Sequence, residues 1–325
     1  MASTLTDLNN FDLIAVTGED AAKFLQGQLT CNVEKVTTTY SISGAYCDIN
    51  GRIISDLRLI AMNDTLYLLC ASGMGFALKK ILDKYIVFSN AKTALASNQY
   101  ERYGMYGADA KETINSLFGA VPELQDQVLQ IKGGVVFRLA GSEPRYELLL
   151  SVEQDEMLER LQDIGVTDDL EEWELADIRE GIVHINPEIQ DTYTPQLLNY
   201  DLTGFIDFKK GCYTGQEIIA RMHYRGTAKK RLFRAAVQDI RASLNSQIMH
   251  SSEIVGEIVS VAMTDTGSYE LLAILPCDLV EHKAVLELLN DRSESGEGVA
   301  GRSTLKILPL PSLQIPKTRS EQENP

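Results

Sequence analysis

The sequence predicts an α+β protein that ends in a small all-β domain. Up to about residue 228, apolar runs with strand periodicity alternate with amphipathic helical stripes, as in an α+β body with antiparallel sheets. After Arg231 the pattern changes to short apolar runs separated by turns, which is the spacing of a small β-barrel. We therefore divide the chain into residues 1–228, residues 229–311 and a polar tail, 312–325, that we expect to be disordered.

The individual elements follow from periodicity and turn residues. Asn50-Gly51 predicts a hairpin turn, Ser72 is expected to cap the helix whose apolar stripe runs from Met74 to Tyr85, and Gly119 is expected to end another helix. Strands are predicted at 11–16, 53–62, 66–70, 100–107, 128–139 (broken at 133–134), 146–152, 232–237, 253–262, 269–275, 285–289 and 304–308. Helices are predicted at 21–29, 110–118, 157–165 and 170–180.

The composition excludes several classes of protein. The 325 residues carry a net charge of −16, which argues against general nucleic-acid binding. Neither a secretory signal nor an apolar run of about 20 residues is present, so we expect a cytoplasmic protein that does not enter a membrane. The five cysteines are scattered and form no C-x-x-C pair, which predicts neither a disulfide framework nor a metal site.

One stretch combines several features that activate a thiol. Cys212 follows Lys209, Lys210 and Gly211 and precedes Thr214, which has the capping-box spacing to Glu217. We expect Thr214 to start a helix that ends at Gly226. A helix N-terminus and nearby lysines both favour a thiolate, so Cys212 is the candidate reactive cysteine. The alternative is that Cys212 is an inert, buried residue like most free cysteines.

Basic residues concentrate around this stretch. Between residues 209 and 234 one acid, Glu217, faces eight basic residues, a local charge of +7 on an acidic chain; the basic residues are Lys209, Lys210, Arg221, Arg225, Lys229, Lys230, Arg231 and Arg234. Such a patch suggests an anionic small molecule. A solvated surface without a ligand is the alternative interpretation.

The predicted helix at 170–180 carries a second candidate site. Trp173, Ala176, Asp177 and Glu180 recur at helical spacing, which places the one tryptophan on the same face as two carboxylates. A flat ring and a carboxylate suit a planar heterocycle with adjacent N–H donors, such as a pterin. A half-buried tryptophan beside a solvated acid pair is the alternative.

Several of these segments resemble the YgfZ family, folate-binding proteins related to the T-protein (aminomethyltransferase) of the glycine cleavage system. Lys210 to Glu217 reads Lys-Gly-Cys-Tyr-Thr-Gly-Gln-Glu and matches the family signature throughout. Residues 24–30, 46–52 and 195–200 are also similar. The resemblance implies a T-protein-like fold of two interleaved α+β domains and a C-terminal barrel. It also implies a tetrahydrofolate-dependent role in iron–sulfur cluster assembly or repair, which supports tRNA-modifying enzymes indirectly through transient contacts with iron–sulfur enzymes or assembly proteins.

The resemblance assigns roles to individual residues. Glu180 aligns with the glutamate that holds the pterin, and Phe11 stands where the family has a second folate-site tryptophan, so its indole N–H is lost. The cofactor-binding candidates are Trp173, Glu180, Phe11, Asp177, Gln216, Arg221 and Lys210, and Cys212 is the catalytic candidate. Lys210 and Arg221 would hold the thiolate and nearby anions.

Three alternatives remain open from the sequence. A one-carbon transferase of the T-protein type would need the acid pair of Gly-Gly-Ile-Ile-Asp-Asp, but the matching text, 51–56, has Ser55 in place of the first acid. A thiol enzyme would need a base near Cys212, and His184 has no place in the predicted elements. A binding scaffold with an inert cysteine is the third. We therefore expect an accessory factor more than a conventional aminomethyltransferase.

Overall fold

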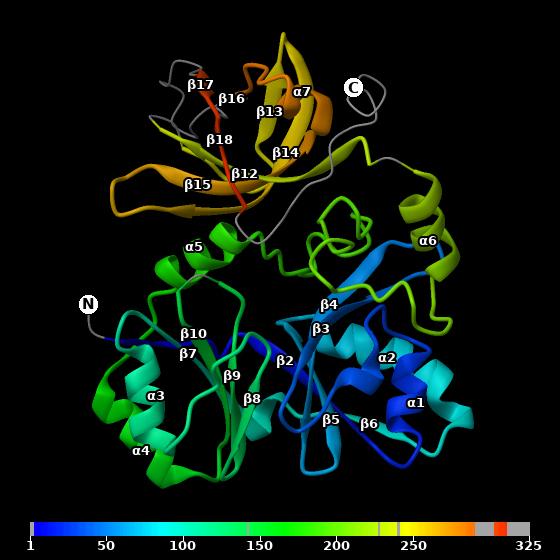
Figure 1. Ribbon diagram of the computed structural model, residues 1–325, viewed down its shortest axis with the longest axis vertical. Coiled ribbons are helices and arrows are strands. Elements are labelled where there is room, and N and C mark those ends of the chain that lie inside the picture. Colours follow the sequence, from blue (N-terminus) through cyan, green and yellow to red (C-terminus); the bar gives the residue numbers. More distant parts are fainter. Residues whose placement is uncertain (1–2, 142, 227, 239–240, 290–301, 311–325) are drawn as a thin grey trace. The chain divides into compact units, whose positions relative to one another are not determined.

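The computed structural model describes residues 3–141, 143–226, 228–238, 241–289 and 302–310. They form two compact units (Figure 1). The first contains the described part of 1–170 together with 184–193 and 204–218; the second contains 171–183, 194–203 and the described part of 219–325. The predicted tail, 312–325, lies outside the described residues, and the predicted domain boundaries at 228 and 311 stay predictions.

The first unit contains a five-stranded antiparallel sheet in the order β3-β4-β5-β2-β6. Its strands are β2 (Phe11–Thr17), β3 (Ile42–Cys47), β4 (Ile53–Met62), β5 (Thr65–Ala71) and β6 (Lys92–Leu95). The predicted hairpin turn joins β3 to β4: Gly51 has φ +73°, and the Asp48 carboxylate accepts hydrogen bonds from the backbone of Asn50 at 2.9 Å and Arg52 at 2.7 Å. The expected strands at 11–16, 53–62 and 66–70 are thereby confirmed.

Helices α1 (Ala21–Gln26) and α2 (Gly75–Tyr85) belong to the same unit, with short 3-10 turns η1 (Val33–Lys35), η2 (Ile86–Phe88) and η3 (Ser97–Gln99). The prediction that Ser72 caps α2 is wrong. The Asp12 carboxylate on β2 instead accepts the amide hydrogen of Gly75 at 2.7 Å. A carboxylate at a helix N-terminus satisfies a free N–H group and interacts well with the helix dipole, so no local cap is needed.

A second sheet of the first unit has six strands in the order β11-β1-β7-β10-β9-β8. The strands are β1 (Thr4–Asp7), β7 (Tyr100–Tyr106), β8 (Val128–Ile131), β9 (Gly134–Arg138), β10 (Arg145–Ser151) and β11 (Val166–Thr167). The expectation of antiparallel sheets is wrong for one pair, because β1 and β11 run parallel. The sheet packs on α3 (Ala110–Phe118) and α4 (Asp155–Ile164) through a buried apolar cluster that includes Ile114 and Leu161 (Figure 1).

The second unit is built on a seven-stranded antiparallel sheet in the order β17-β16-β13-β14-β15-β12-β18. The strands are β12 (Lys230–Val237), β13 (Gln247–His250), β14 (Glu253–Met263), β15 (Tyr269–Pro276), β16 (Glu287–Leu289), β17 (Arg302–Thr304) and β18 (Lys306–Leu308). Only Leu305 separates the two edge strands, β17 and β18, in the chain, so the sheet must curl until its edges nearly meet. The predicted barrel-like domain is confirmed.

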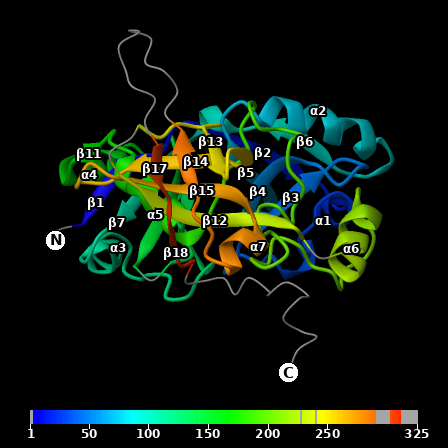
Figure 2. The ribbon, with the colours of Figure 1, turned by 90° about the horizontal axis from the view of Figure 1, so that it is seen from above.

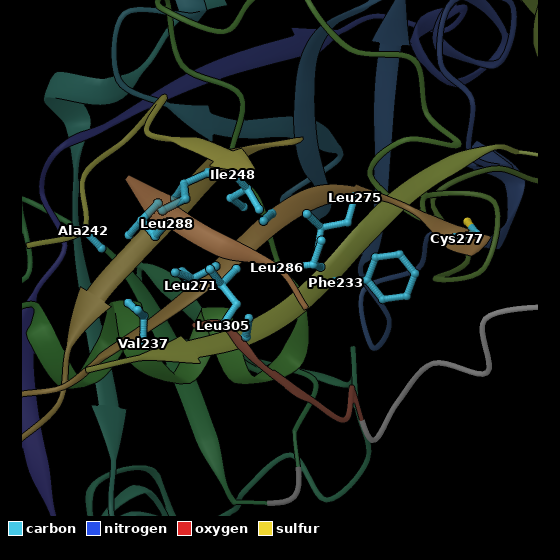
Figure 3. Close-up of a cluster of buried hydrophobic side chains, with 13 residues drawn as sticks. Phe233, Val237, Ala242, Ile248, Leu271, Leu275, Cys277, Leu286, Leu288 and Leu305 are labelled. Carbon is cyan, nitrogen blue, oxygen red and sulfur yellow. The ribbon is translucent and has the colours of Figure 1, made fainter. Parts of the chain in front are cut away.

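The core of this barrel is apolar. Ile248, Leu271 and Leu288 are fully buried and point into the same interior cluster, which Leu305 joins from the link between the edge strands (Figure 3). Short helix α7 (Cys277–Glu281) contributes the buried Cys277 to this cluster. Burial of apolar surface therefore holds the barrel together.

Helix α5 (Glu171–Glu180) belongs to the second unit and packs on β14 and β15 of the barrel (Figure 2). A charged cluster joins helix and sheet. Glu270 on β15 is buried and accepts hydrogen bonds from Arg234 at 2.8 Å and from Arg179 of α5 at 3.3 Å. Two cations around one buried carboxylate give α5 a fixed position on the barrel.

Segment 194–203 is attached to the barrel by a buried ion pair. Arg231 at the start of β12 donates two hydrogen bonds to the Asp201 carboxylate, both 2.9 Å long, and a third to the side chain of Asn199 at 3.2 Å. The side chains of Arg231 and Asp201 are 8% and 3% exposed. Because both charges are removed from water, each depends on the other for its stability. Among the described residues, no helix is long and apolar enough to cross a bilayer.

Candidate functional site

Helix α5 places its tryptophan and its carboxylates as the periodicity predicts. Trp173, Asp177 and Glu180 are spaced i, i+4 and i+7, so they lie along one face of the helix. Trp173 and Asp177 are buried and Glu180 is half-buried. An aromatic ring and two carboxylates that are largely shielded from water form a surface suited to a flat ligand with several N–H donors.

The residue after Glu180 fixes the end of this helix. Gly181 has φ +73°, its amide bonds to the carbonyl of Ile178 at 3.1 Å, and the amide of Ile182 bonds to the carbonyl of Asp177 at 2.9 Å. This is the Schellman pattern, which favours glycine at the left-handed position. Glu180 is thus a candidate ligand-binding residue, and Gly181 forms the backbone turn that fixes its position.

Lys210 anchors the cysteine loop, residues 205–215, inside the first unit. Its ammonium group is buried and donates hydrogen bonds to the carbonyls of Leu29 and Cys31, both 2.6 Å long. It also lies 5.2 Å from the centre of the buried Tyr213 ring. Burial lowers the pKa of Lys210 to about 8. The sequence indicated a charge beside the thiol, but it could not show that this ammonium binds backbone carbonyls.

Further bonds join the cysteine loop to residues 29–35. The hydroxyl of Thr30 donates to the carbonyl of Phe205 at 2.6 Å, and its carbonyl accepts the amide of Asp207 at 3.0 Å. The Asp207 carboxylate pairs with Lys35 at 2.7 Å. The side chain of Lys35 is 62% exposed, so this ion pair adds little stability. The bonds to Thr30 and those of Lys210 therefore fix the loop.

The cysteine loop enters α6 (Gln216–Arg225) through a glycine turn. Gly215 has φ +80°, and a Cβ there would overlap the carbonyl oxygen of Asp48 in the β3–β4 turn. The prediction that Thr214 is the N-cap is wrong by one position, because Gly215 immediately precedes the helix and Thr214 lies beside Tyr46. The predicted end at Gly226 is confirmed.

Cys212 differs from the other four cysteines in exposure. Its side chain is exposed four residues before α6, whereas Cys31, Cys47, Cys70 and Cys277 are buried. Burial raises the pKa of Cys31 and of Cys277 to about 11, and it raises the pKa of Cys47 and Cys70 further. Neutral thiols are poor nucleophiles, so Cys212 is the thiol that reagents in solution can reach.

The remaining candidates lie in different settings. Phe11 begins β2, is buried, and has the Arg102 guanidinium 5.9 Å from its ring centre. Gln216 is half-buried at the first position of α6, and Arg221 is exposed on the same helix. The basic segment 209–234 is less positive at the surface than its sequence suggests, because three of its members are buried or paired: Lys210, Arg231 and Arg234.

The structure also reveals a pair that sequence reasoning missed. Nδ1 of His184 lies 3.1 Å from one carboxylate oxygen of Asp56, and the other oxygen accepts the amide hydrogen of Ile185 at 2.7 Å. His184 begins a segment of the first unit that runs beside β4: the amide of Ile53 bonds to the carbonyl of Tyr193, and its carbonyl accepts the amide of Asp191, both at 2.9 Å. The sequence comparison did draw attention to Asp56, because residues 51–56 were compared with the acid pair of the T-protein. It could not show that His184 is the partner of Asp56.

The fold and these segments place the chain in a known class. A crystal structure of glycine cleavage system aminomethyltransferase T from Bartonella henselae is similar over 98% of this chain and 88% of that chain, with a TM-score of 0.78 and 16% identity. The family described as GCVT N-terminal domain matches residues 1–132. The chain thus has the fold of the T-protein class, as predicted.

Curated relatives narrow this class to a family. The chain is 30% identical over 305 residues to tRNA-modifying protein YgfZ of Hamiltonella defensa, with 89% of this chain and 88% of that protein covered. It is 30% identical over 317 residues to the protein of the same name from Pectobacterium carotovorum, with 96% and 92% covered. The chain belongs to the YgfZ family.

Proposed function

We propose that this protein binds a tetrahydrofolate and supports iron–sulfur enzymes that modify tRNA, as an accessory factor and not as an aminomethyltransferase. The observation that carries the folate part is the face of α5 on which Trp173, Asp177 and Glu180 lie, on a helix fixed by its glycine cap. The tRNA part is supported by the name that both relatives carry, tRNA-modifying protein YgfZ.

The chemistry of these side chains fits a reduced pterin. The indole of Trp173 offers a flat apolar surface, and a carboxylate at Glu180 can accept two hydrogen bonds from adjacent N–H groups. Asp177, one turn earlier, adds a second acceptor on the same face. When bound, tetrahydrofolate would supply amine nitrogens able to carry a one-carbon unit.

The other candidates take separate roles in this proposal. Phe11, Gln216 and Arg221 stay predicted ligand contacts, as an apolar ring, an amide and a cation. Lys210 has an indirect role, because its ammonium group already donates hydrogen bonds to two backbone carbonyls. It would hold the cysteine loop in position and not contact the ligand itself. Cys212 handles iron, sulfur or an oxidised intermediate delivered by a transient iron–sulfur partner protein.

The link to tRNA is indirect in this proposal. The net charge of −16 opposes binding to a polyanion, whose contacts depend on Lys and Arg. Three of the eight basic residues of the segment 209–234 are also buried or paired. The protein would therefore act on the enzymes that modify tRNA and not on tRNA itself.

Two observations disfavour the rival functions. Ser55 stands where the T-protein text has an acid, and its hydroxyl donates to the backbone carbonyl of Asp56 at 2.7 Å, which weighs against aminomethyl transfer. A thiol enzyme would need a base on Cys212, and the Nδ1 atom of His184 instead lies 3.1 Å from the Asp56 carboxylate.

Tetrahydrofolate titration tests the folate part of the proposal. Because Trp173 is the one tryptophan, its fluorescence reports binding in the wild type and in Glu180→Ala, while calorimetry follows Trp173→Ala. We expect micromolar binding that weakens at least tenfold in Glu180→Ala, since a hydrogen bond to a charged group contributes about 1.5–3 kcal/mol. Binding should also weaken in Trp173→Ala, which removes the flat apolar surface for the ring. Glu172→Ala, which changes an exposed acid of the same helix, is the control and should bind like the wild type. Absence of wild-type binding up to millimolar tetrahydrofolate would refute the proposal.

The tRNA part needs a cellular assay. Wild type and Cys212→Ala are expressed in a bacterial strain that lacks its own YgfZ, and the modified nucleosides of its tRNA are measured by mass spectrometry. We expect the wild type to restore them and Cys212→Ala to fail, with Cys277→Ala as a matched cysteine control. Equal restoration by wild type and Cys212→Ala would leave the protein as a binding scaffold with an inert cysteine.

A further inference from the structure

Two short segments of the first unit expose large apolar side chains. Phe88 on η2 is 98% exposed, and Tyr85 and Val87 just before it are more than half exposed. Ile49, in the β3–β4 turn, is 76% exposed. Single exposed apolar residues are common on proteins. Three of them within residues 85–88 are a larger exposed area, of the kind that another molecule covers. We call these four residues the apolar patch.

Both segments of the apolar patch adjoin the cysteine loop. The carbonyl oxygen that precedes Ile49 lies where a Cβ on Gly215 would be. Thr214 lies beside Tyr46 of β3. Burial raises the pKa of Tyr46 and the phenol of Tyr85 raises it further, so Tyr85 is a neighbour of the same ring. All of these residues belong to the first unit, so their arrangement depends on one compact body.

Cys212 is within reach of a molecule that covers the patch. Its side chain is exposed, and it precedes Thr214 by two residues, so the two Cα atoms are at most about 7 Å apart. A protein–protein interface of standard size buries about 800 Å² on each partner and extends roughly 15 Å from its centre. A protein partner on the apolar patch would therefore also extend over the cysteine loop.

The segments around the patch are basic, although the chain is acidic. Residues 48–52, 75–88 and 205–215 contain six basic and three acidic residues, a net charge of +3 in a chain of −16. Lys84 and Lys209 are exposed among them. Opposite charges steer two proteins together and suppress wrong partners, so this surface favours a partner whose contact surface is acidic.

We propose that the apolar patch is the docking surface for an acidic partner protein, which it brings to the thiol of Cys212. Apolar side chains of the partner cover Phe88, and its carboxylates face Lys84. The inference rests on the proposed function for what the partner carries, which is iron or sulfur, and it adds where on this chain the partner binds.

Other occupants fit the charges less well. In a two-fold dimer a second copy of the chain would place two surfaces of charge +3 against each other. An anionic membrane or an RNA would repel a chain whose net charge is −16. Each of these occupants is a distinct outcome of the experiment below.

Photo-crosslinking tests the docking directly. The photoreactive amino acid p-benzoylphenylalanine replaces Phe88 in the full chain, in a bacterial strain that lacks its own YgfZ, and mass spectrometry identifies what it captures. We expect an acidic iron–sulfur protein, with a yield that falls by about threefold or more when Lys84→Glu is added and is kept by Lys84→Arg, because reversal turns attraction into repulsion. The same probe at Leu124, an exposed apolar residue outside the patch, is the matched control. Capture of a second copy, lipid or RNA, a yield that ignores Lys84→Glu, or no capture beyond that at Leu124 would overturn the proposal.

A second measurement asks whether the docking matters for function. In the cellular tRNA assay at limiting expression, Phe88→Ser should lower modified nucleosides by about threefold or more, since aromatic anchors carry much of the binding energy of an interface. Leu124→Ser should act like the wild type. Phe88 is almost fully exposed, so serine leaves the core intact, and wild-type thermal unfolding of the variant verifies its fold. Full restoration by Phe88→Ser would refute the proposal.

The outcomes for docking and for folate binding are separable. Phe88→Ser should bind tetrahydrofolate like the wild type, because Phe88 belongs to the first unit and α5 to the second. If the wild type binds no tetrahydrofolate, the proposed function fails, while capture at position 88 still decides whether the patch docks a partner. If tetrahydrofolate binds and Phe88→Ser is fully active, only the docking proposal fails.

Discussion

The buried ammonium of Lys210 predicts a pH dependence of stability with a definite sign. Burial lowers the pKa of this lysine from 10.5 to about 8. Between these two values the unfolded chain carries a proton that the folded chain lacks, so the free energy of unfolding rises with pH. The contribution is smallest below pH 8 and complete above pH 10.5. One pKa unit corresponds to about 1.4 kcal/mol, so the whole shift is worth about 3 kcal/mol.

Buried cysteines act in the opposite direction and limit the useful range. Burial raises the pKa of Cys31 and of Cys277 from 9.0 to about 11. Above pH 9 the unfolded chain releases thiol protons that the folded chain retains, so these groups lower the free energy of unfolding as pH rises. The effect of Lys210 should therefore be measured between pH 8 and pH 9, as a difference between two proteins.

The assay compares urea unfolding of the wild type, Lys210→Met and Lys209→Met, followed by circular dichroism. Lys210→Met should be less stable at every pH, because the carbonyls of Leu29 and Cys31 lose their donor, at a cost of roughly 1–3 kcal/mol each. The gap between wild type and Lys210→Met should widen by about 1 kcal/mol from pH 8 to pH 9. Lys209, which is exposed, is the matched control and should give a curve parallel to the wild type. A gap that stays constant or narrows in this range would refute the assignment.

Three further predictions test other contacts. In the native protein, one thiol should react rapidly with a thiol-specific reagent, and absorbance measures the number of thiols that have reacted. Cys212→Ser should remove this fast phase. A fast phase that survives in the variant would contradict the exposure of Cys212. Gly215→Ala should lower the free energy of unfolding by about 1–3 kcal/mol, since it combines a left-handed φ with overlap on Asp48, and chemical denaturation measures it; Gly211→Ala, where a Cβ meets nothing, is the control. Arg231→Met should cost about 3–5 kcal/mol by leaving the Asp201 carboxylate buried and unpaired, and equal stability of this variant would show that the pair is not needed.

Most of the fold follows from local patterns in the sequence. The ten residues of β4, the helix of α3 with Gly119 behind it, and the apolar runs of the barrel all show their period directly. Strand β13 was missed because its four residues are too few to show a period. The cap of α2 was misassigned because its acceptor, Asp12, lies 63 residues before Gly75 in the chain.

The candidate site residues likewise divide into those that a local pattern predicts and those that depend on distant partners. The stripe on α5 depends only on helical spacing, so Trp173 and Glu180 could be named in advance. Lys210 could be named as well, but its bonds to Leu29 and Cys31 cross about 180 residues, and no local pattern records them. His184 could be named but not placed, because its hydrogen-bond partner Asp56 is 128 residues away in the chain.

The alternation of the two units along the chain has a consequence for biosynthesis. The polypeptide passes from one unit to the other five times, after residues 170, 183, 193, 203 and 218. A ribosome that has made the first 170 residues has therefore completed neither unit, and Ile53 must wait for residues 191 and 193 before both of its backbone groups are paired. The first unit therefore stays incomplete until the cysteine loop has been synthesised. Neither unit can be excised as one continuous fragment, and a gene truncated after residue 170 would leave the backbone groups of Ile53 without their partners at residues 191 and 193.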